Sequence, residues 1–149
     1  MYIITLNFEQ EVIMYILIVD GQGGGVGRQL IQSLRAEFAD DFIMAVGTNS
    51  AATSAMLKAG ASAGATGENA VIVAAKKADI IAGPVGIVIA DSLYGEITSN
   101  MALAIAQSPA KRVLLPFQHC DNIIVGVGDF NISNLISLAV QEIKDLKKQ

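Results

Sequence analysis

The sequence predicts an α/β fold, in which a doubly wound, mainly parallel sheet of five to six strands carries helices on both faces. Three observations support this prediction. Short apolar runs rich in Val and Ile alternate along the chain with segments of helical periodicity. The connections between them are short, which favours right-handed strand–helix–strand crossovers. A composition with 52% hydrophobic and only 16% charged residues suits buried parallel strands packed by small side chains.

Three strand–helix pairs are predicted in the first half of the chain. The strands are apolar runs, as expected inside a parallel sheet. The first helix places Leu30, Ile31 and Leu34 at core spacing, and the second stops at Gly60, a common residue after a helix. In chain order, the expected elements are strand 15–19, helix 25–38, strand 42–46, helix 51–59, strand 61–65 and helix 66–77.

The second half continues the alternation and ends in a long amphipathic helix. Residues 85–90 fit two interpretations, because their β-branched side chains suggest a strand and their glycines a loop. Thr98 or Ser99 is the expected N-cap of the next helix. Pro116 ends the strand expected at 111–115. The expected elements are strand 79–82, a helix ending at 107, strand 111–115, strand 122–127 and helix 130–148.

Length indicates one domain, residues 14–149, preceded by an extension at 1–13 that can also hold an extra strand at 2–6. A formal charge of −4 without a basic stripe before the C-terminus argues against nucleic-acid binding.

No signal peptide or membrane span is expected, and a single cysteine, Cys120, fits a reducing cytoplasm. Few charges lie between residues 42 and 110, which predicts a homo-oligomer.

A glycine-rich segment, residues 21–27, follows the first strand and precedes the first helix. Glycine permits a tight turn and lets another molecule approach the backbone closely. The following helix directs its free N–H groups and its positive dipole end at this turn, which makes an anion site. The expected ligand is a phosphate-containing nucleotide. The predicted ligand-binding residues here are Gly21, Gln22, Gly23, Gly24, Gly25, Val26 and Gly27.

Further ligand-binding residues are expected at neighbouring strand ends, because ligands of doubly wound sheets bind beyond the carboxyl ends of the strands. A NAD site usually has an acid after the second strand, but this chain has Thr48, Asn49 and Ser50. This neutral set is more compatible with a 2′-phosphate than an acid would be, but no arginine lies nearby in the sequence to bind one. NAD(P) is therefore expected alongside other phosphate-bearing ligands. Glu68, at a predicted helix start, either caps that helix or accepts hydrogen bonds from a ribose.

The spacing Gly21-x-x-x-Gly25-x-Gly27 resembles the nucleotide-binding loop of the short-chain dehydrogenases, which are Rossmann-like proteins. The resemblance implies that Gly21 makes the turn, Gly25 admits the pyrophosphate and Gly27 allows helix–strand contact. The Tyr-x-x-x-Lys motif of that family does not occur, because Thr98 stands four positions after Tyr94. The resemblance therefore implies binding without that family's catalytic pair.

A wider set of motifs resembles an uncharacterised bacterial family of short Rossmann-like proteins. The motifs are Val-Asp-Gly-Gln-Gly-Gly-Gly (19–25), Val-Gly-Thr-Asn-Ser (46–50), Ala-Thr-Gly-Glu-Asn-Ala (65–70), Gly-Pro-Val-Gly (83–86) and Gly-Glu-Ile-Thr (95–98). This resemblance implies the Rossmann-like fold and no particular reaction.

Four residues are candidates for proton transfer: Asp91, Tyr94, Glu96 and His119. Asp91 and Glu96 flank a loop and are either paired carboxylates or two surface charges. His119 precedes Cys120 after the fifth strand, and no second His or Cys exists to complete a zinc site, so no metal is expected.

The sequence is compatible with three functions. The leading hypothesis is a small cytoplasmic sensor or subunit that binds a nucleotide, NAD(P), on the glycine-rich segment. The second is a NAD(P)-dependent enzyme whose site is completed at an oligomer interface. The third is a non-catalytic assembly subunit that binds no nucleotide.

Overall fold

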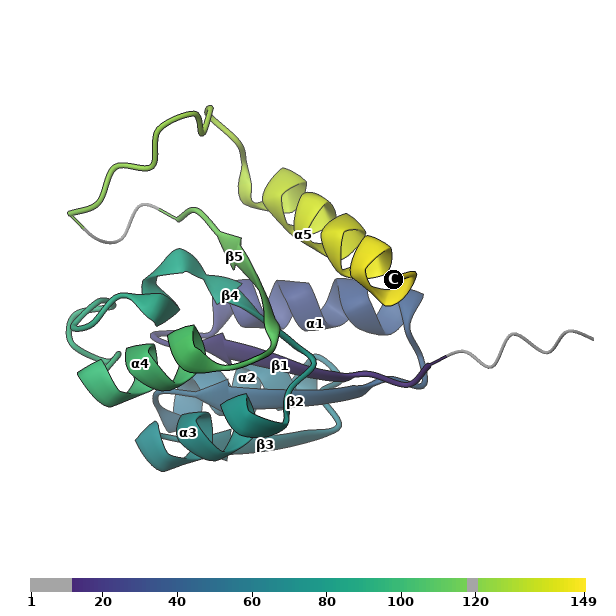
Figure 1. Ribbon diagram of the computed structural model, residues 1–149, viewed down its shortest axis with the longest axis horizontal. Coiled ribbons are helices and arrows are strands. Elements are labelled where there is room, and N and C mark those ends of the chain that lie inside the picture. Colours follow the sequence, from purple (N-terminus) through teal and green to yellow (C-terminus); the bar gives the residue numbers. More distant parts are fainter. Residues whose placement is uncertain (1–11, 118–120) are drawn as a thin grey trace, which may run out of the picture.

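The computed structural model describes residues 12–117 and 121–149, and within them all strands belong to one parallel sheet of order β3-β2-β1-β4-β5 (Figure 1). The predicted doubly wound, Rossmann-like α/β fold is confirmed. The strands are β1 (Tyr15–Asp20), β2 (Phe42–Gly47), β3 (Ala63–Thr66), β4 (Ile80–Pro84) and β5 (Lys111–Leu115). The extra strand considered at 2–6 lies outside the described residues.

Helices cover both faces of the sheet (Figure 1). They are α1 (Gly25–Glu37), α2 (Ser50–Lys58), α3 (Glu68–Lys77), α4 (Ser99–Gln107) and α5 (Ile132–Lys147), with a 3-10 helix, η1 (Val85–Val88). Thr98 caps α4 by accepting the Met101 N–H at 3.1 Å, as one of the two predicted caps. None of the helices in the described ranges has the length and apolar character that a bilayer crossing requires.

The two cores follow from the alternation of side chains along the strands. In β1, Ile16 and Ile18 belong to the core under α1, α2 and α5, whereas Leu17 and Val19 belong to the core under α3 and α4. All four side chains are fully buried. Burial of one such side chain contributes about 1.5–3 kcal/mol, so these two clusters hold the sheet between its helix layers.

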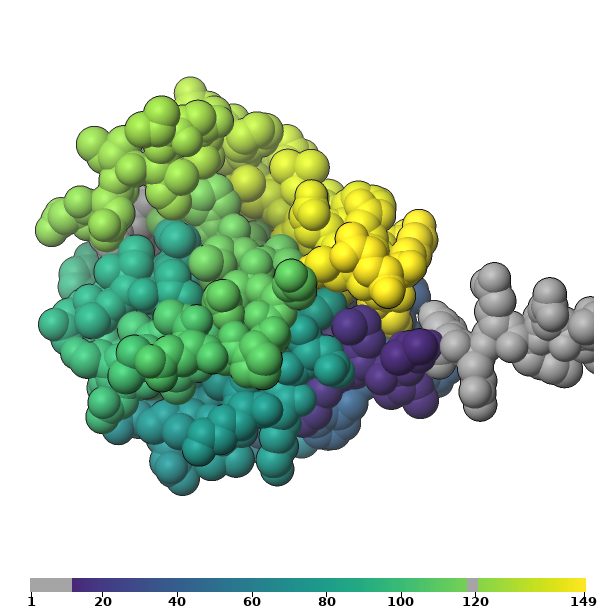
Figure 2. All heavy atoms as spheres, viewed as in Figure 1, coloured from purple at the N-terminus to yellow at the C-terminus, as the bar shows by residue number. Residues whose placement is uncertain are grey.

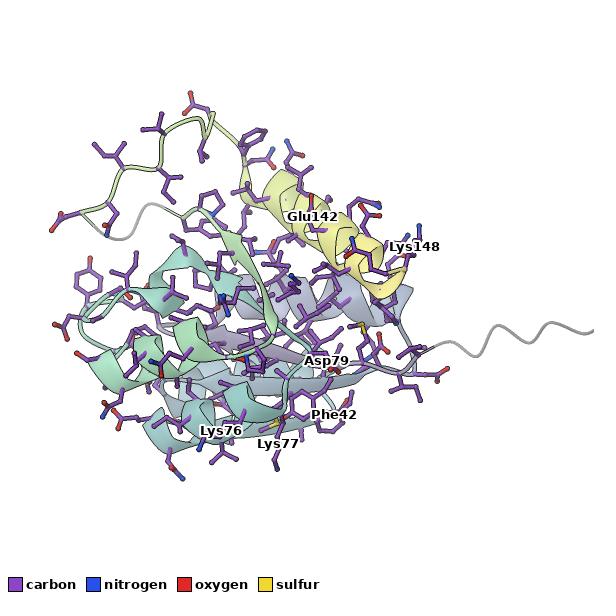
Figure 3. All side chains as sticks on the ribbon, in the orientation of Figure 1. Phe42, Lys76, Lys77, Asp79, Glu142 and Lys148 are labelled. Atoms are coloured by element: carbon purple, nitrogen blue, oxygen red, sulfur yellow. The ribbon has the colours of Figure 1, made fainter. Side chains whose placement is uncertain are left out.

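The order of the strands places the reversal of winding between β1 and β4. The carboxyl ends of both strands therefore meet at one edge of the sheet, where ligands of such folds bind. At the amino ends of the strands, neighbouring segments contact one another: the Tyr15 N–H donates to Asp79 at 2.8 Å, and the Tyr15 ring lies 4.9 Å from that of Phe42. Asp79 and Phe42 are labelled in Figure 3.

A buried ion pair links the C-terminal end of α5 to Asp41, the residue before β2. The Lys147 ammonium pairs with the Asp41 carboxylate, and the two side chains are only 9% and 3% exposed. Asp41 also accepts the Met14 N–H at 3.1 Å, while the Lys147 nitrogen lies 4.1 Å from the centre of the Phe38 ring. This contact joins the last helix to the beginning of the sheet.

The strand predicted at 122–127 is wrong. Residues 121–131, here termed the arm, contain no strand, and Ile123 and Val125 are each 93% exposed. A strand parallel to β5 needs a crossover of a dozen or more residues, and 116–121 are too few. Gly126, with φ 87°, also interrupts the extended backbone. Figure 2 shows the arm as a ridge at the top of the molecule.

The ambiguous segment 85–90 begins as η1 rather than as a strand. A 3-10 turn fits there because β4 ends at Pro84 and the chain must leave the sheet at once. The segment after η1, residues 89–98, is termed the strap, because it crosses from the end of β4 toward the ends of β1 and β2.

Candidate functional site

The glycine-rich segment, the glycine loop (21–27), forms a tight turn between β1 and α1. The Gly24 N–H donates to the Gly21 carbonyl at 2.9 Å, and Gly24, the N-cap of α1, has φ 72°. A Cβ at Gly24 would also lie 2.9 Å from the Ala52 backbone. Both the left-handed backbone and this close approach to α2 require glycine at position 24.

Two further glycines allow close packing beneath the loop. A Cβ at Gly21 would lie 2.7 Å from Thr48 Oγ1 and 2.9 Å from Leu93 Cδ1. A Cβ at Gly27 would overlap Met56 Sδ and lie 3.0 Å from Asp20 Cβ. Gly21 and Gly27 are therefore explained by contacts within the chain.

Gly23 and Gly25 differ from the other glycines of the loop. Both are exposed, neither has a positive φ, and a Cβ at either position would meet nothing within 4 Å. Within the described residues, neither backbone N–H has a hydrogen-bond partner. No contact within the described chain requires glycine at these positions, and their N–H groups are open to another molecule at the start of α1.

Asp20, the last residue of β1, lies under the loop and was not among the predicted site residues. Its buried carboxylate accepts the Gly21 N–H at 2.8 Å and the Gly27 N–H at 2.7 Å. Burial raises the pKa of Asp20, and the nearby charge of Glu96 adds to this effect, while the Gly27, Gly21 and Val26 N–H groups oppose it. An acid directly before a glycine turn and a helix start is the signal that could have identified it.

The raised pKa of Asp20 predicts a measurable pH dependence. Because the pKa of Asp20 is higher in the folded state, the folded state binds more protons than the unfolded state between the ordinary pKa of about 3.9 and the raised pKa. The free energy of unfolding that this group contributes therefore falls as pH rises through that window. A titration of the Asp20 carboxyl carbon by NMR is expected to show a midpoint above the ordinary value. A midpoint at or below that value would contradict the assigned environment.

The strap reaches the loop through a backbone of unusual conformation. Asp91, Leu93 and Tyr94 have φ values of 63°, 54° and 55°, and Gly95 has 85°. Such conformations cost energy for residues other than glycine and persist only where surrounding contacts enforce them. Here the Asp91 N–H donates to the Ile97 carbonyl at 2.8 Å, and the Leu93 side chain is buried against Gly21.

Glu96 joins the strap to the ends of two strands. Its Oε1 accepts hydrogen bonds from Thr48 Oγ1 at 3.0 Å and from Asn49 Nδ2 at 2.5 Å. Its Oε2 accepts the Gln22 N–H at 3.0 Å. Asn49 also donates to the Gln22 carbonyl at 2.9 Å and caps α2 through the Ala52 N–H. The structure therefore brings together the predicted residues Gln22, Thr48 and Asn49 around Glu96, a residue predicted for catalysis.

The remaining predicted residues lie apart from this cluster or outside the described residues. Ser50 is the exposed first residue of α2. Glu68 begins α3 and accepts hydrogen bonds from Thr98 Oγ1 at 2.5 Å and Asn100 Nδ2 at 3.2 Å, which lower its pKa. Tyr94 is 97% exposed. His119 lies in the segment that the structure does not describe.

Two cavities open elsewhere on the surface. One, of about 800 Å³, lies between the arm and the start of α5 and is lined by Phe117 and Leu135 among others. The second, of about 380 Å³, lies between α3 and α4. Neither is lined by a residue of the glycine loop. The described residues include no group of three or more His, Cys, Asp or Glu side chains arranged to hold a metal ion.

Comparison with known proteins identifies the family. No curated protein matches the chain. Among solved structures, a dodecameric FMN-dependent UbiX-like decarboxylase from Escherichia coli O157:H7 is 18% identical, with a TM-score of 0.47 over 88% of this chain and 76% of that one. A family model described as "Domain of unknown function (DUF3842)" matches residues 15–148. The chain therefore belongs to the DUF3842 family, in agreement with the resemblance to an uncharacterised family.

Proposed function

We propose that this protein binds a phosphate-containing nucleotide, NAD(P) among the candidates, on the outer face of the glycine loop. The observation that carries the proposal is the pair Gly23 and Gly25, whose N–H groups have no partner among the described residues and whose missing side chains leave open space. Such N–H groups at a helix start are good donors to phosphate oxygens.

The surroundings of the loop support this proposal. Asp20 already occupies the Gly21 and Gly27 N–H groups from inside the fold, so a ligand meets only the outer donors. The Glu96 carboxylate beside them is an acceptor. A nucleoside phosphate offers the matching groups: its phosphate oxygens can accept hydrogen bonds from the N–H groups, and its ribose hydroxyl can donate to the carboxylate. The loop also lies at the edge where doubly wound sheets bind ligands.

A binding role is favoured over a catalytic one by the arrangement of the candidate acids. Among the described residues, no side-chain hydrogen bond links Asp91, Tyr94 and Glu96 to one another. Glu96 is instead held by donors at the strand ends. We therefore propose a sensor or a subunit rather than a complete enzyme, and the exposed apolar arm supports a homo-oligomer.

Thermal-shift measurements test nucleotide binding. A ligand at 100 times its Kd stabilises the folded state by about 2.7 kcal/mol, which raises Tm by roughly 5–10 °C for a chain of this size. NAD⁺, NADP⁺ and ADP at millimolar concentration are the probes, with inorganic phosphate as the comparison. Gly25→Val is expected to abolish the shift, because its side chain fills the open space beside the Gly25 N–H.

The matched control is Ala36→Val, which introduces the same valine side chain at an exposed position near the other end of α1. This variant is expected to keep the full ligand-induced shift, and both variants to keep the Tm of the free protein within about 2 °C. No shift of the wild-type protein with any nucleotide, or an undiminished shift of Gly25→Val, would overturn the proposed function.

A further inference from the structure

We propose that Glu96 recognises the ribose of the bound nucleotide and selects ligands with a free 2′-hydroxyl over ligands with a 2′-phosphate. The inference rests on the proposed function, since it names the class of nucleotide that the same site takes. It concerns a residue that the strap carries to the site from the end of β4.

The position of the Glu96 carboxylate supports this role. A dinucleotide site commonly places an acid after the second strand, where its oxygens accept the ribose hydroxyls. Here the chain after β2 is neutral, with Thr48 and Asn49, yet both side chains donate to Glu96 Oε1, at 3.0 and 2.5 Å. The strap therefore supplies from another part of the chain the carboxylate that the end of β2 lacks.

The hydrogen-bonding capacity of Glu96 also suits a ribose hydroxyl. A carboxylate has about four acceptor positions and no donor when ionised. Oε1 accepts from Thr48 and Asn49, whereas Oε2 accepts the Gln22 N–H at 3.0 Å and keeps a second position. Glu96 is half-buried, so part of the residue stays open to a ligand. A ribose hydroxyl can donate to it, but a fully ionised phosphate cannot.

The charge around Glu96 favours a ligand with a free 2′-hydroxyl. Within the described residues, no lysine or arginine pairs with Glu96, and the Asp20 carboxylate lies close enough for their charges to interact. A 2′-phosphate would place a further charge of about −1.5 to −2 beside Glu96 and above the buried Asp20. Contact between like charges in a partly buried site strongly disfavours a ligand. The site is therefore built to accept the hydroxyl and to reject the phosphate.

The test compares the affinities of NAD⁺ and NADP⁺, which differ only in the 2′-phosphate, by isothermal titration calorimetry. The wild-type protein is expected to bind NAD⁺ on the order of 100-fold more tightly. Glu96→Gln is expected to bring this ratio close to one, because the amide removes the charge and one acceptor. A residue that only holds the strap in place would change both affinities by the same factor, so the ratio separates the two roles.

Two variants and one further ligand complete the experiment. Glu142→Gln, on the exposed face of α5 (Figure 3), removes one charge elsewhere and is expected to leave the ratio unchanged. Glu68→Gln is also expected to leave it unchanged, since within the described residues that carboxylate is bonded to Thr98 and Asn100 and not to the glycine loop. The wild-type protein is expected to bind 2′-deoxy-ADP about 10-fold more weakly than ADP, a result that needs no variant to fold.

The outcomes distinguish this inference from the proposed function. Binding of NADP⁺ at least as tight as that of NAD⁺, equal affinities for ADP and 2′-deoxy-ADP, or a ratio that changes in Glu68→Gln and not in Glu96→Gln would overturn the role of Glu96. Each of these leaves nucleotide binding in place. If the wild-type protein binds neither dinucleotide nor ADP, the proposed function itself fails.

Discussion

Replacement of Lys147 by methionine is expected to lower the free energy of unfolding by about 3–5 kcal/mol. Methionine keeps the apolar stem near Phe38 but removes the ammonium, so the Asp41 carboxylate stays buried without its counter-charge. An unpaired buried charge is among the most destabilising defects known. Urea denaturation followed by circular dichroism measures the change.

A matched ion pair on the same helix provides the control. Lys144 pairs with Glu37 at 2.9 Å, but these side chains are 34% and 45% exposed. Exposed pairs contribute about 0–1 kcal/mol, so Lys144→Met is expected to change stability by no more than that. The double variant with Lys147→Met and Asp41→Asn is expected to regain part of the loss, because no full charge is then buried. Equal losses of unfolding free energy in Lys147→Met and Lys144→Met would show that the ion pair with Asp41 does not stabilise the packing of α5.

Gly27→Val is expected to lower the free energy of unfolding by about 2–3 kcal/mol. The new Cβ would overlap Met56 Sδ and crowd Asp20, so the buried Met56 side chain must repack, and Asp20, which accepts the Gly27 N–H, must give way. Denaturation in urea with an unchanged m-value would report this loss of stability.

The comparison for this variant is Gly25→Val, two positions earlier in the same helix. Its Cβ meets nothing within 4 Å, so its stability is expected to stay close to that of the wild-type protein. The two glycines thus separate a requirement of the fold from a requirement of the ligand. A Gly27→Val protein as stable as Gly25→Val would contradict the packing described for α1.

The fold was predictable because each buried element carries a local pattern. The strand over Lys111–Leu115 and the helix after Thr98 follow from apolar runs and a capping residue, and the structure has both. The strand predicted at 122–127 failed because β-branched side chains such as Ile123 show a preference for extended backbone but cannot supply a neighbouring strand. The short link after Leu115 excludes parallel pairing there, and this signal was available in the sequence.

The site was predictable only in part. The glycine loop is contiguous, so its turn and its neighbouring helix are visible in the sequence. Glu96 lies 48 positions from Thr48 and 74 from Gln22, and only the path of the strap brings these residues together. No local pattern contains that path, because it depends on left-handed backbone at Leu93 and Tyr94 that their residue types do not favour.

The outer N–H groups of the glycine loop are expected to hold the nucleotide. An NMR titration of the protein labelled with ¹⁵N-glycine, with NAD⁺ and ADP as ligands, measures this at single residues. The largest saturable amide shifts are expected at Gly23 and Gly25, and those of distant glycines such as Gly60 are expected to stay small. Absence of saturable shifts at Gly23 and Gly25, with or without shifts elsewhere, would contradict it.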